Sequence, residues 1–143
     1  MYLFNRSISV NVRLVDEGTT LMVDGFFLDS HHELCLSIKV NIESNTITSA
    51  DGDFRRFPHT DCALTKEHIK KLIGINLNKN VRKQIQMAVG LKEGCTHLTD
   101  LAIECAKGLM QAQYQFLQLT MREEELNNMV EQFLDGSCLH YTK

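Results

Sequence analysis

Apolar and polar residues alternate with a period of two near the start of the chain. Polar residues separate four apolar ones: Ile8, Val10, Val12 and Leu14. Because successive side chains of a strand point to opposite faces, this alternation predicts a strand with one buried face. Further strands are expected at about residues 20–28, 34–42 and, as a short one, 46–48. The segment from Asp51 to Pro58 is expected to close the sheet, so the pattern predicts an antiparallel meander of three to four strands.

From about residue 65 the apolar residues recur at steps of three and four, which is typical of amphipathic helices. A first short helix is expected near Thr65 and ends at Gly74, and a second runs from a cap at Asn78 to Gly90. A third helix is predicted to begin with Thr96 as its N-cap. Its apolar stripe comprises Leu98, Leu101, Ala102, Cys105, Leu109, Ala112, Phe116 and Leu119. The apolar face of the sheet and the apolar stripes of the helices are therefore expected to pack against each other.

The third helix is unusually long. An uninterrupted helix from Thr96 to Leu134 would measure roughly 55–60 Å at 1.5 Å per residue, more than a small sheet covers. Either it breaks near Thr120 and folds back, or its outer half packs on a protein partner or on a second copy of the chain. Its methionines, which suit an adaptable contact surface, are Met110, Met121 and Met129. The sequence leaves both interpretations open.

Strands followed by helices predict a two-layer α+β fold. Residues 1–143 are expected to form a single domain, with the sheet in residues 1–58 and C-terminal helices, the last one long, in residues 62–135.

Composition and charge narrow the function classes. The chain is 43% hydrophobic and 23% charged, which is ordinary for a globular protein. A formal net charge of -3 argues against a nucleic-acid partner, which would favour a basic face. No apolar run approaches the roughly 20 residues that cross a bilayer, and the first residues lack the order of a signal peptide. A cytoplasmic protein without a membrane partner is therefore expected.

The five cysteines are an odd number, which argues against a disulfide framework and favours free thiols, core residues or ligands. Cys105 lies on the apolar stripe and is expected in the core, and Cys35 is expected to be packed in its strand. Cys95 and His97 stand at the predicted start of the third helix. The free amides of a helix start stabilise a thiolate, and thiolate and imidazole are ligands that zinc and iron favour. A buried cysteine beside a hydrogen-bonded histidine is the structural alternative.

Further ligands are available if the segments converge. Cys62 lies just ahead of the first predicted helix, where it either approaches Cys95 or packs under the loop after Pro58. Asp29 or His31, in the polar turn between the second and third strands, would supply another ligand. Such residues serve most often as plain turn residues. Cys138 and His140 either fold back onto the site or belong to a mobile tail.

The order of these residues resembles a bacterial family of domains of unknown function. Its members share a Cys, a later Leu-x-Gly and then Gly-Cys-x-His-Leu. The residues that carry the resemblance are Asp29, Pro58, Cys62, Leu72-Ile73-Gly74, Gly94-Cys95-Thr96-His97-Leu98 and Cys138. This family implies no activity.

The layout is also similar, more distantly, to NifU/IscU-type iron–sulfur scaffold proteins. That resemblance implies a two-layer fold and a metal site formed by Asp29 or His31 together with Cys62, Cys95 and His97. The chain departs from the scaffold pattern because its hairpin has no cysteine and because His97 follows Cys95 by two residues. A single zinc or iron ion is therefore expected rather than a labile cluster.

Three functions follow in order of preference. The first is a metal-binding accessory or scaffold protein that uses Asp29, His31, Cys62, Cys95 and His97. The second is a thiol enzyme with Cys95 as nucleophile and a histidine as base. The third is an interaction domain that acts through the long helix. Catalysis is not favoured, because the chain has no glycine-rich phosphate loop, nucleophile elbow or His-Glu-x-x-His motif.

Overall fold

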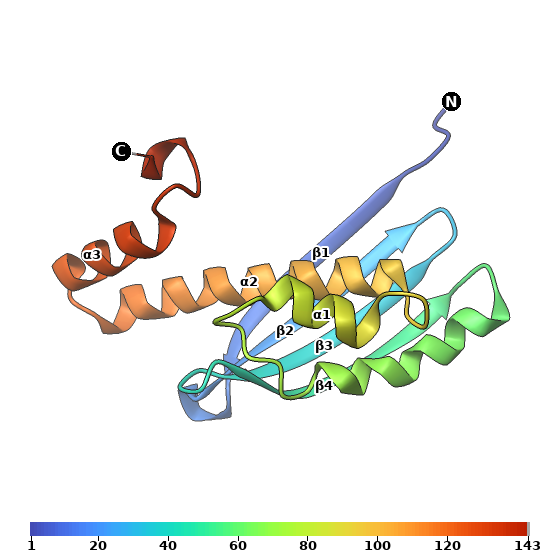
Figure 1. Cartoon of the computed structure of the whole chain (residues 1–143), viewed down its shortest axis with the longest axis horizontal. Helices are drawn as coiled ribbons and strands as arrows, with labels where there is room; N and C mark the ends of the chain where they lie inside the picture. The colour runs from blue at the N-terminus through green and yellow to red at the C-terminus, as the bar shows by residue number, and fades with distance from the viewer. Residues whose placement is uncertain (143) are drawn as a thin grey trace. The chain divides into compact units, whose positions relative to one another are not determined.

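The computed structural model describes residues 1–142. Four antiparallel strands, joined in sequence order, form one sheet (Figure 1). They are β1 (Arg6–Val15), β2 (Thr20–Asp29), β3 (Glu33–Asn41) and β4 (Thr46–Arg56). The predicted α+β fold and its meander are confirmed.

The last strand is longer than expected. β4 continues through Asp51, Gly52 and Asp53, which the sequence suggested would close the sheet, and pairs with β3 along this stretch. Asp51 and Asp53 point to the uncovered face, where charge is tolerated. A side chain at Gly52 would collide with the backbone oxygen of Cys35, so glycine serves here for a close approach of two strands and not for a turn.

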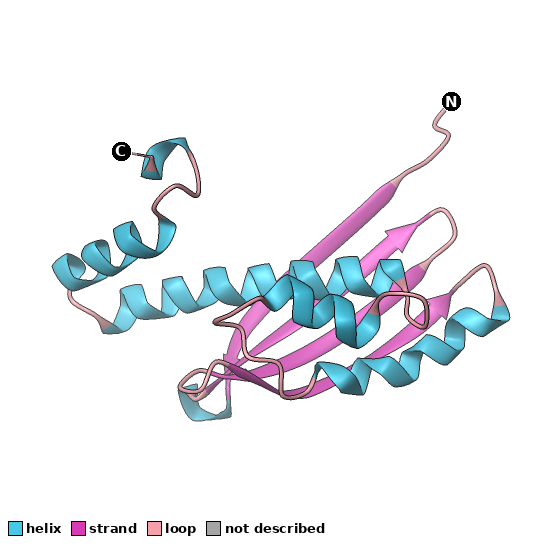
Figure 2. Cartoon of the chain, in the orientation of Figure 1, coloured by secondary structure: helices cyan, strands magenta, loops and turns pink. Residues whose placement is uncertain are grey.

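The helical elements follow the sheet in sequence (Figure 2). They are the 3₁₀ helix η2 (Thr60–Leu72) and the α-helices α1 (Val81–Val89), α2 (Thr96–Thr120) and α3 (Glu123–Leu134). Two short 3₁₀ turns, η1 (Asp16–Gly18) and η3 (Leu139–Tyr141), complete the chain. None of the helices within residues 1–142 combines the length and apolarity needed to cross a membrane.

The first compact unit comprises Met1–Ala112. In it η2, α1 and the first part of α2 cover one face of the sheet (Figure 1). Alternate residues of β2 are accordingly buried, as at Val23 and Phe27, while Phe26 and Leu28 on the other face are exposed. The first part of the predicted stripe of α2 is confirmed as core, whereas Leu119 at its end is exposed. The fully buried residues are Leu98, Leu101, Ala102, Cys105 and Leu109.

Two glycines allow α2 to lie close to the sheet. A Cβ at Gly25 of β2 would collide with the sulfur of Cys105. A Cβ at Gly108 of α2 would lie 2.6 Å from Cγ1 of Val10 on β1. The missing side chains therefore fix how α2 crosses the first two strands, which in turn fixes where the start of α2 meets the β2–β3 turn.

The second unit begins at Gln113, within α2. The helix ends at Thr120 and α3 begins at Glu123, so the break near Thr120, one of the two interpretations that the sequence leaves open, is present. Arg122 between them has extended dihedral angles, φ −70° and ψ 143°. In the last turn the hydroxyl of Thr120 donates to the carbonyl oxygen of Phe116, a local bond that competes with helix continuation.

Three predicted helix starts are wrong in detail. Asn80, not Asn78, precedes α1. Cys62 lies inside η2 and not ahead of it. The start of this helix was missed because a 3₁₀ helix lacks the 3.6-residue period of an α-helix. Cys95, not Thr96, is the residue that caps α2, and its sulfur accepts the amide hydrogen of Leu98 at 3.5 Å.

Candidate metal centre

The β2–β3 turn is held by a single carboxylate. Asp29 is the last residue of β2, and its Oδ1 accepts the backbone amides of His31 at 2.8 Å and His32 at 2.7 Å. The amide of Asp29 in turn donates to the carbonyl oxygen of His32 at 3.0 Å. Asp is favoured in such turns because its short side chain reaches the amides two and three residues on. The sequence Asp-Ser-His-His therefore builds its own rigid turn.

Arg56, the last residue of β4, holds the same turn from the neighbouring strand. Its guanidinium donates to the carbonyl oxygens of Ser30 and Asp29, both at 2.7 Å. A third contact, to the carbonyl oxygen of His32, is 3.5 Å long. The planar guanidinium presents several donors in a fixed arrangement, which suits several carbonyls at once. The backbone that carries Asp29 and His32 is thus fixed on both sides.

The start of α2 reaches the turn from the helical layer. The amide of Cys95 donates to the carbonyl oxygen of Val89, the last residue of α1, at 2.8 Å. Any side chain at Gly94 would collide with the carbonyl oxygens of Val89 and Gly90. This close backbone packing positions the first turn of α2, and with it His97.

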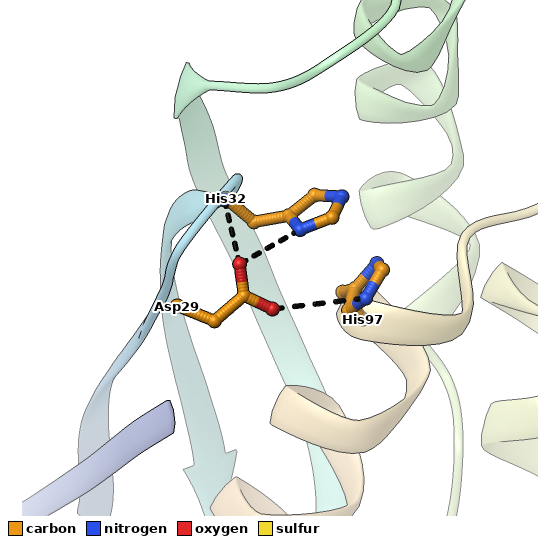
Figure 3. Close-up of side chains that lie close together, drawn as sticks. All are labelled: Asp29, His32 and His97. Carbon is orange, nitrogen blue, oxygen red and sulfur yellow. Dashed lines mark hydrogen bonds and ion pairs between the residues drawn. The ribbon is translucent and has the colours of Figure 1, made fainter. Parts of the chain in front are cut away.

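Asp29, His32 and His97 meet at this point and are called the triad below (Figure 3). Nδ1 of His32 lies 2.9 Å from Oδ1 of Asp29, and Nε2 of His97 lies 3.9 Å from its Oδ2. The two imidazole rings stack with centroids 3.7 Å apart and planes 31° apart. Phe27 contacts His97 edge-on at 5.3 Å between ring centroids. One carboxylate thus contacts two stacked imidazoles that come from different layers of the fold.

The triad has the composition of a metal site. Each member offers one ligand atom, and these atoms lie within 4.8 Å of one another. Within residues 1–142 no other group of three His, Cys, Asp or Glu residues meets that distance. The side chain of Asp29 is only 2% exposed, whereas those of His32 and His97 are 13% and 26% exposed. Two imidazoles and a carboxylate form the donor set of many zinc and non-haem iron sites.

The electrostatics favour a charged carboxylate at Asp29 and a neutral imidazole at His97. Burial alone would raise the pKa of Asp29, but hydrogen bonds from the His31 amide and from His32 outweigh it and hold the pKa well below its usual range. Burial, and to a smaller extent the neighbouring His32, lower the pKa of His97. Arg6 is the nearby cation, with a guanidinium nitrogen 3.6 Å from Oδ2 of Asp29. These are the protonation states that a metal ion requires of its ligands.

A pocket of about 730 Å³ opens beside the triad. His32 and His97 belong to its lining. The lining offers the carboxylates of Asp61 and Glu93, and its histidines and cysteines are His32, His59, Cys62, His68, Cys95 and His97. Four of the chain's six histidines thus border one cavity.

Cys95 does not resemble an activated nucleophile. Burial raises the pKa of its thiol, and the hydrogen bond from the Leu98 amide offsets this only in part. The helix start therefore does not create the reactive thiolate that the sequence suggested.

The structure brings together some of the residues singled out from the sequence. Asp29 and His97 belong to the triad, and Cys62 and Cys95 line the adjoining pocket. The side chain of His31 is exposed, and its amide is the group that contacts Asp29.

The remaining expectations concern other parts of the chain. His59 and His68 also line the pocket. Cys105 is buried as predicted, and Cys35 is half-buried in β3. Cys138 and His140 lie in the second unit, Cys138 as an exposed thiol.

His32 is the triad member that sequence reasoning missed. The signal was present, because an Asp that ends a strand and accepts the amides of the next residues brings the side chain three positions later back toward itself. Two adjacent histidines could be told apart only by this turn geometry.

The comparisons with known proteins bear on the family and not on the site. A family model described as "Protein of unknown function (DUF2889)" matches residues 4–111, which include the triad and nearly the whole first unit. No curated protein and no solved structure matches the chain, so the resemblance to iron–sulfur scaffold proteins stays a prediction. Because the match covers well over half of the sequence, the chain belongs to the DUF2889 family of proteins of unknown function.

Proposed function

We propose that this protein is a metal-binding accessory or scaffold protein that holds one zinc or ferrous ion at Asp29, His32 and His97. The observation that carries the proposal is the convergence of three ligand atoms within 4.8 Å from two layers of the fold. The triad contains no sulfur, so a single ion fits it better than an iron–sulfur cluster.

The triad needs little rearrangement to accept an ion. A tetrahedral zinc with bonds of about 2.0–2.1 Å keeps its ligand atoms a little over 3 Å apart. The 3.9 Å between Nε2 of His97 and Oδ2 of Asp29 closes to that value by a small side-chain rotation. At His32 the metal takes the place that the ring proton has between Nδ1 and Asp29, and the imidazole then carries its proton on Nε2. Oδ1 keeps its two backbone amides throughout.

Arg6 is the cation that the metal displaces from Asp29. It has a second carboxylate available, since its other terminal nitrogen lies 3.8 Å from Oδ2 of Asp100. Its guanidinium also lies over the ring of Phe27, 4.9 Å from the centroid. Moving away from Asp29 therefore leaves Arg6 with a partner and lowers the electrostatic cost of binding an ion.

Three protein ligands leave coordination positions open. His32 and His97 border the pocket, so the open positions face a cavity that admits a small ligand or the donor group of a partner protein. This favours an accessory or scaffold role. The thiol-enzyme alternative is less favoured, because the raised pKa of Cys95 leaves its sulfur protonated at neutral pH.

A second role, contact with a protein partner or a second copy, is favoured by the second unit. Its helices leave large apolar side chains open to solvent, with Leu119 85% and Phe133 71% exposed. Met129, one of the methionines that suit an adaptable surface, is 39% exposed. Light scattering of the protein alone and of a Phe133→Asp variant tests this role, which requires a wild-type assembly larger than the variant.

Metal titration of protein stripped with a chelator tests the main proposal. By calorimetry we expect the wild type to show a binding event of one equivalent, for zinc or for ferrous ion without oxygen, that depends on the triad. Asp29→Asn and His97→Ala each weaken binding by at least 100-fold, while His140→Ala, in the second unit, does not. A folded wild type that takes up neither ion would refute the proposal.

A further inference from the structure

The pocket has a second set of metal-binding side chains outside the triad. One wall is the 3₁₀ helix η2, in which side chains three residues apart lie one above the other. Four pocket-lining residues are spaced in this way, from the residue that precedes η2 to its ninth position: His59, Cys62, Thr65 and His68. These four residues, called the row below, therefore lie on one side of η2 and line the pocket.

The row has a firm backbone. The amide of Cys62 donates to the carbonyl oxygen of His59 at 3.1 Å, and the hydroxyl of Thr65 donates to the carbonyl oxygen of Cys62 at 2.7 Å. At about 2.0 Å rise per residue, neighbours in the row are roughly 6 Å apart along the axis. His59 and Cys62 are thus within reach of one ion, whereas Cys62 and His68 are two turns apart.

Cys95 faces the same cavity from the start of α2. Its sulfur accepts the Leu98 amide at 3.5 Å, and its backbone is anchored to Val89. Cys62 and Cys95 therefore present two free thiols to one space from two separately fixed elements. Neither sulfur belongs to the triad, whose ligand atoms are all nitrogen and oxygen.

We propose that Cys62 and Cys95, with His59 as third ligand, form a second cation site in the pocket wall that prefers soft ions such as cadmium and copper(I). Thiolates select soft and borderline ions, whereas the carboxylate of the triad favours harder ones. The ligand atoms of His59, Cys62 and Cys95 do not all lie within 4.8 Å of one another in the unbound chain, so binding draws them together by side-chain rotation and releases the thiol protons to solvent. The pocket then holds two positions of different chemistry side by side.

Cobalt(II) titration of the reduced protein tests this site, because thiolate ligands give a sulfur-to-metal charge-transfer absorption that nitrogen and oxygen ligands do not. The background variant Cys138→Ser removes the exposed thiol. We expect two cobalt ions per chain and a charge-transfer band. Cys62→Ser and Cys95→Ser each remove the band and one equivalent, and the half-buried control Cys35→Ser removes neither.

The double variant His32→Ala, His97→Ala separates the two proposals. If the thiol site is distinct, this variant keeps the charge-transfer band and loses only the equivalent without it. Loss of the band here would show one shared site and overturn the proposal, as would a wild type without any band or a band that survives both cysteine variants. Loss of the triad equivalent alone leaves the thiol site standing.

Discussion

Two segments deliver the triad, and different physics fixes each one. The β2–β3 turn is held by polar bonds, with Asp29 accepting two backbone amides and Arg56 donating to two carbonyl oxygens. The connection from α1 to α2 is held by close backbone packing, in which Gly94 leaves no room for a side chain. The stability of the turn should therefore depend on charge and pH, and the stability of the connection should depend on side-chain volume.

The largest expected effect is at the carboxylate. Asp29→Ala leaves two part-buried amides and the His32 ring without their acceptor, and each such loss costs about 1–3 kcal/mol. We expect the free energy of unfolding to fall by about 3–5 kcal/mol in urea denaturation. Asp29→Asn, which keeps an acceptor oxygen, should lose clearly less. Equal losses in the two variants would mean that the acceptor does not hold the turn.

Gly94→Ala probes the packed connection. The new methyl group meets the oxygens of Val89 and Gly90, which belong to backbone and cannot rotate away. We expect a loss of about 2–3 kcal/mol. Gly74→Ala is the matched control, because it has open space around it and only the positive φ of 91° to strain it, which costs about 1 kcal/mol. The comparison fails if the two variants are equally stable.

Arg56→Gln removes the guanidinium that donates from the end of β4 to the β2–β3 turn. The loss of two charged hydrogen bonds at the rim of the protein should cost about 1–2 kcal/mol. Because such supporting contacts orient ligands, zinc affinity should also fall about 10–100-fold. A variant that loses stability but binds zinc like the wild type would show that Arg56 supports the fold without positioning the triad.

The slope of the unfolding free energy against pH distinguishes the β2–β3 turn from the connection between α1 and α2. The folded-state pKa of Asp29 lies below the value of about 4 expected for the unfolded chain, so the unfolded state binds more protons as the pH falls. The stabilisation by Asp29 is complete above that value and is lost as the pH drops below it. Asp29→Asn should flatten the decline in unfolding free energy below about pH 4, whereas Gly94→Ala should keep the wild-type slope. Parallel slopes in Asp29→Asn and wild type would contradict this account.

The same contrast explains what the sequence could predict. The period-two pattern was sufficient for the sheet, and the stripe around Cys105 for the core, because both follow from burial on one face. The local composition suggested that the sheet closes at Asp51–Asp53. Strand pairing with β3 overrides that composition. Cys62 was expected ahead of the first helix and not inside it, because η2 is a 3₁₀ helix without the 3.6-residue period.

The site was only partly accessible for a related reason. Asp29 and His97 were recognised from residue type at an element boundary, and they lie in the triad. His32 was not, since choosing between His31 and His32 depends on three hydrogen bonds within the turn. Residue type indicates where ligands are available, and turn geometry decides which of them point inward.

This pair of adjacent histidines also provides the most direct test of the central claim. Zinc titration of His31→Ala and His32→Ala by calorimetry compares two changes of the same size, one at an exposed ring and one at a triad ring. We expect His31→Ala to bind zinc at the triad like the wild type and His32→Ala to lose at least 100-fold in affinity while remaining folded. Equal zinc binding by the two variants would contradict a metal centre at Asp29, His32 and His97.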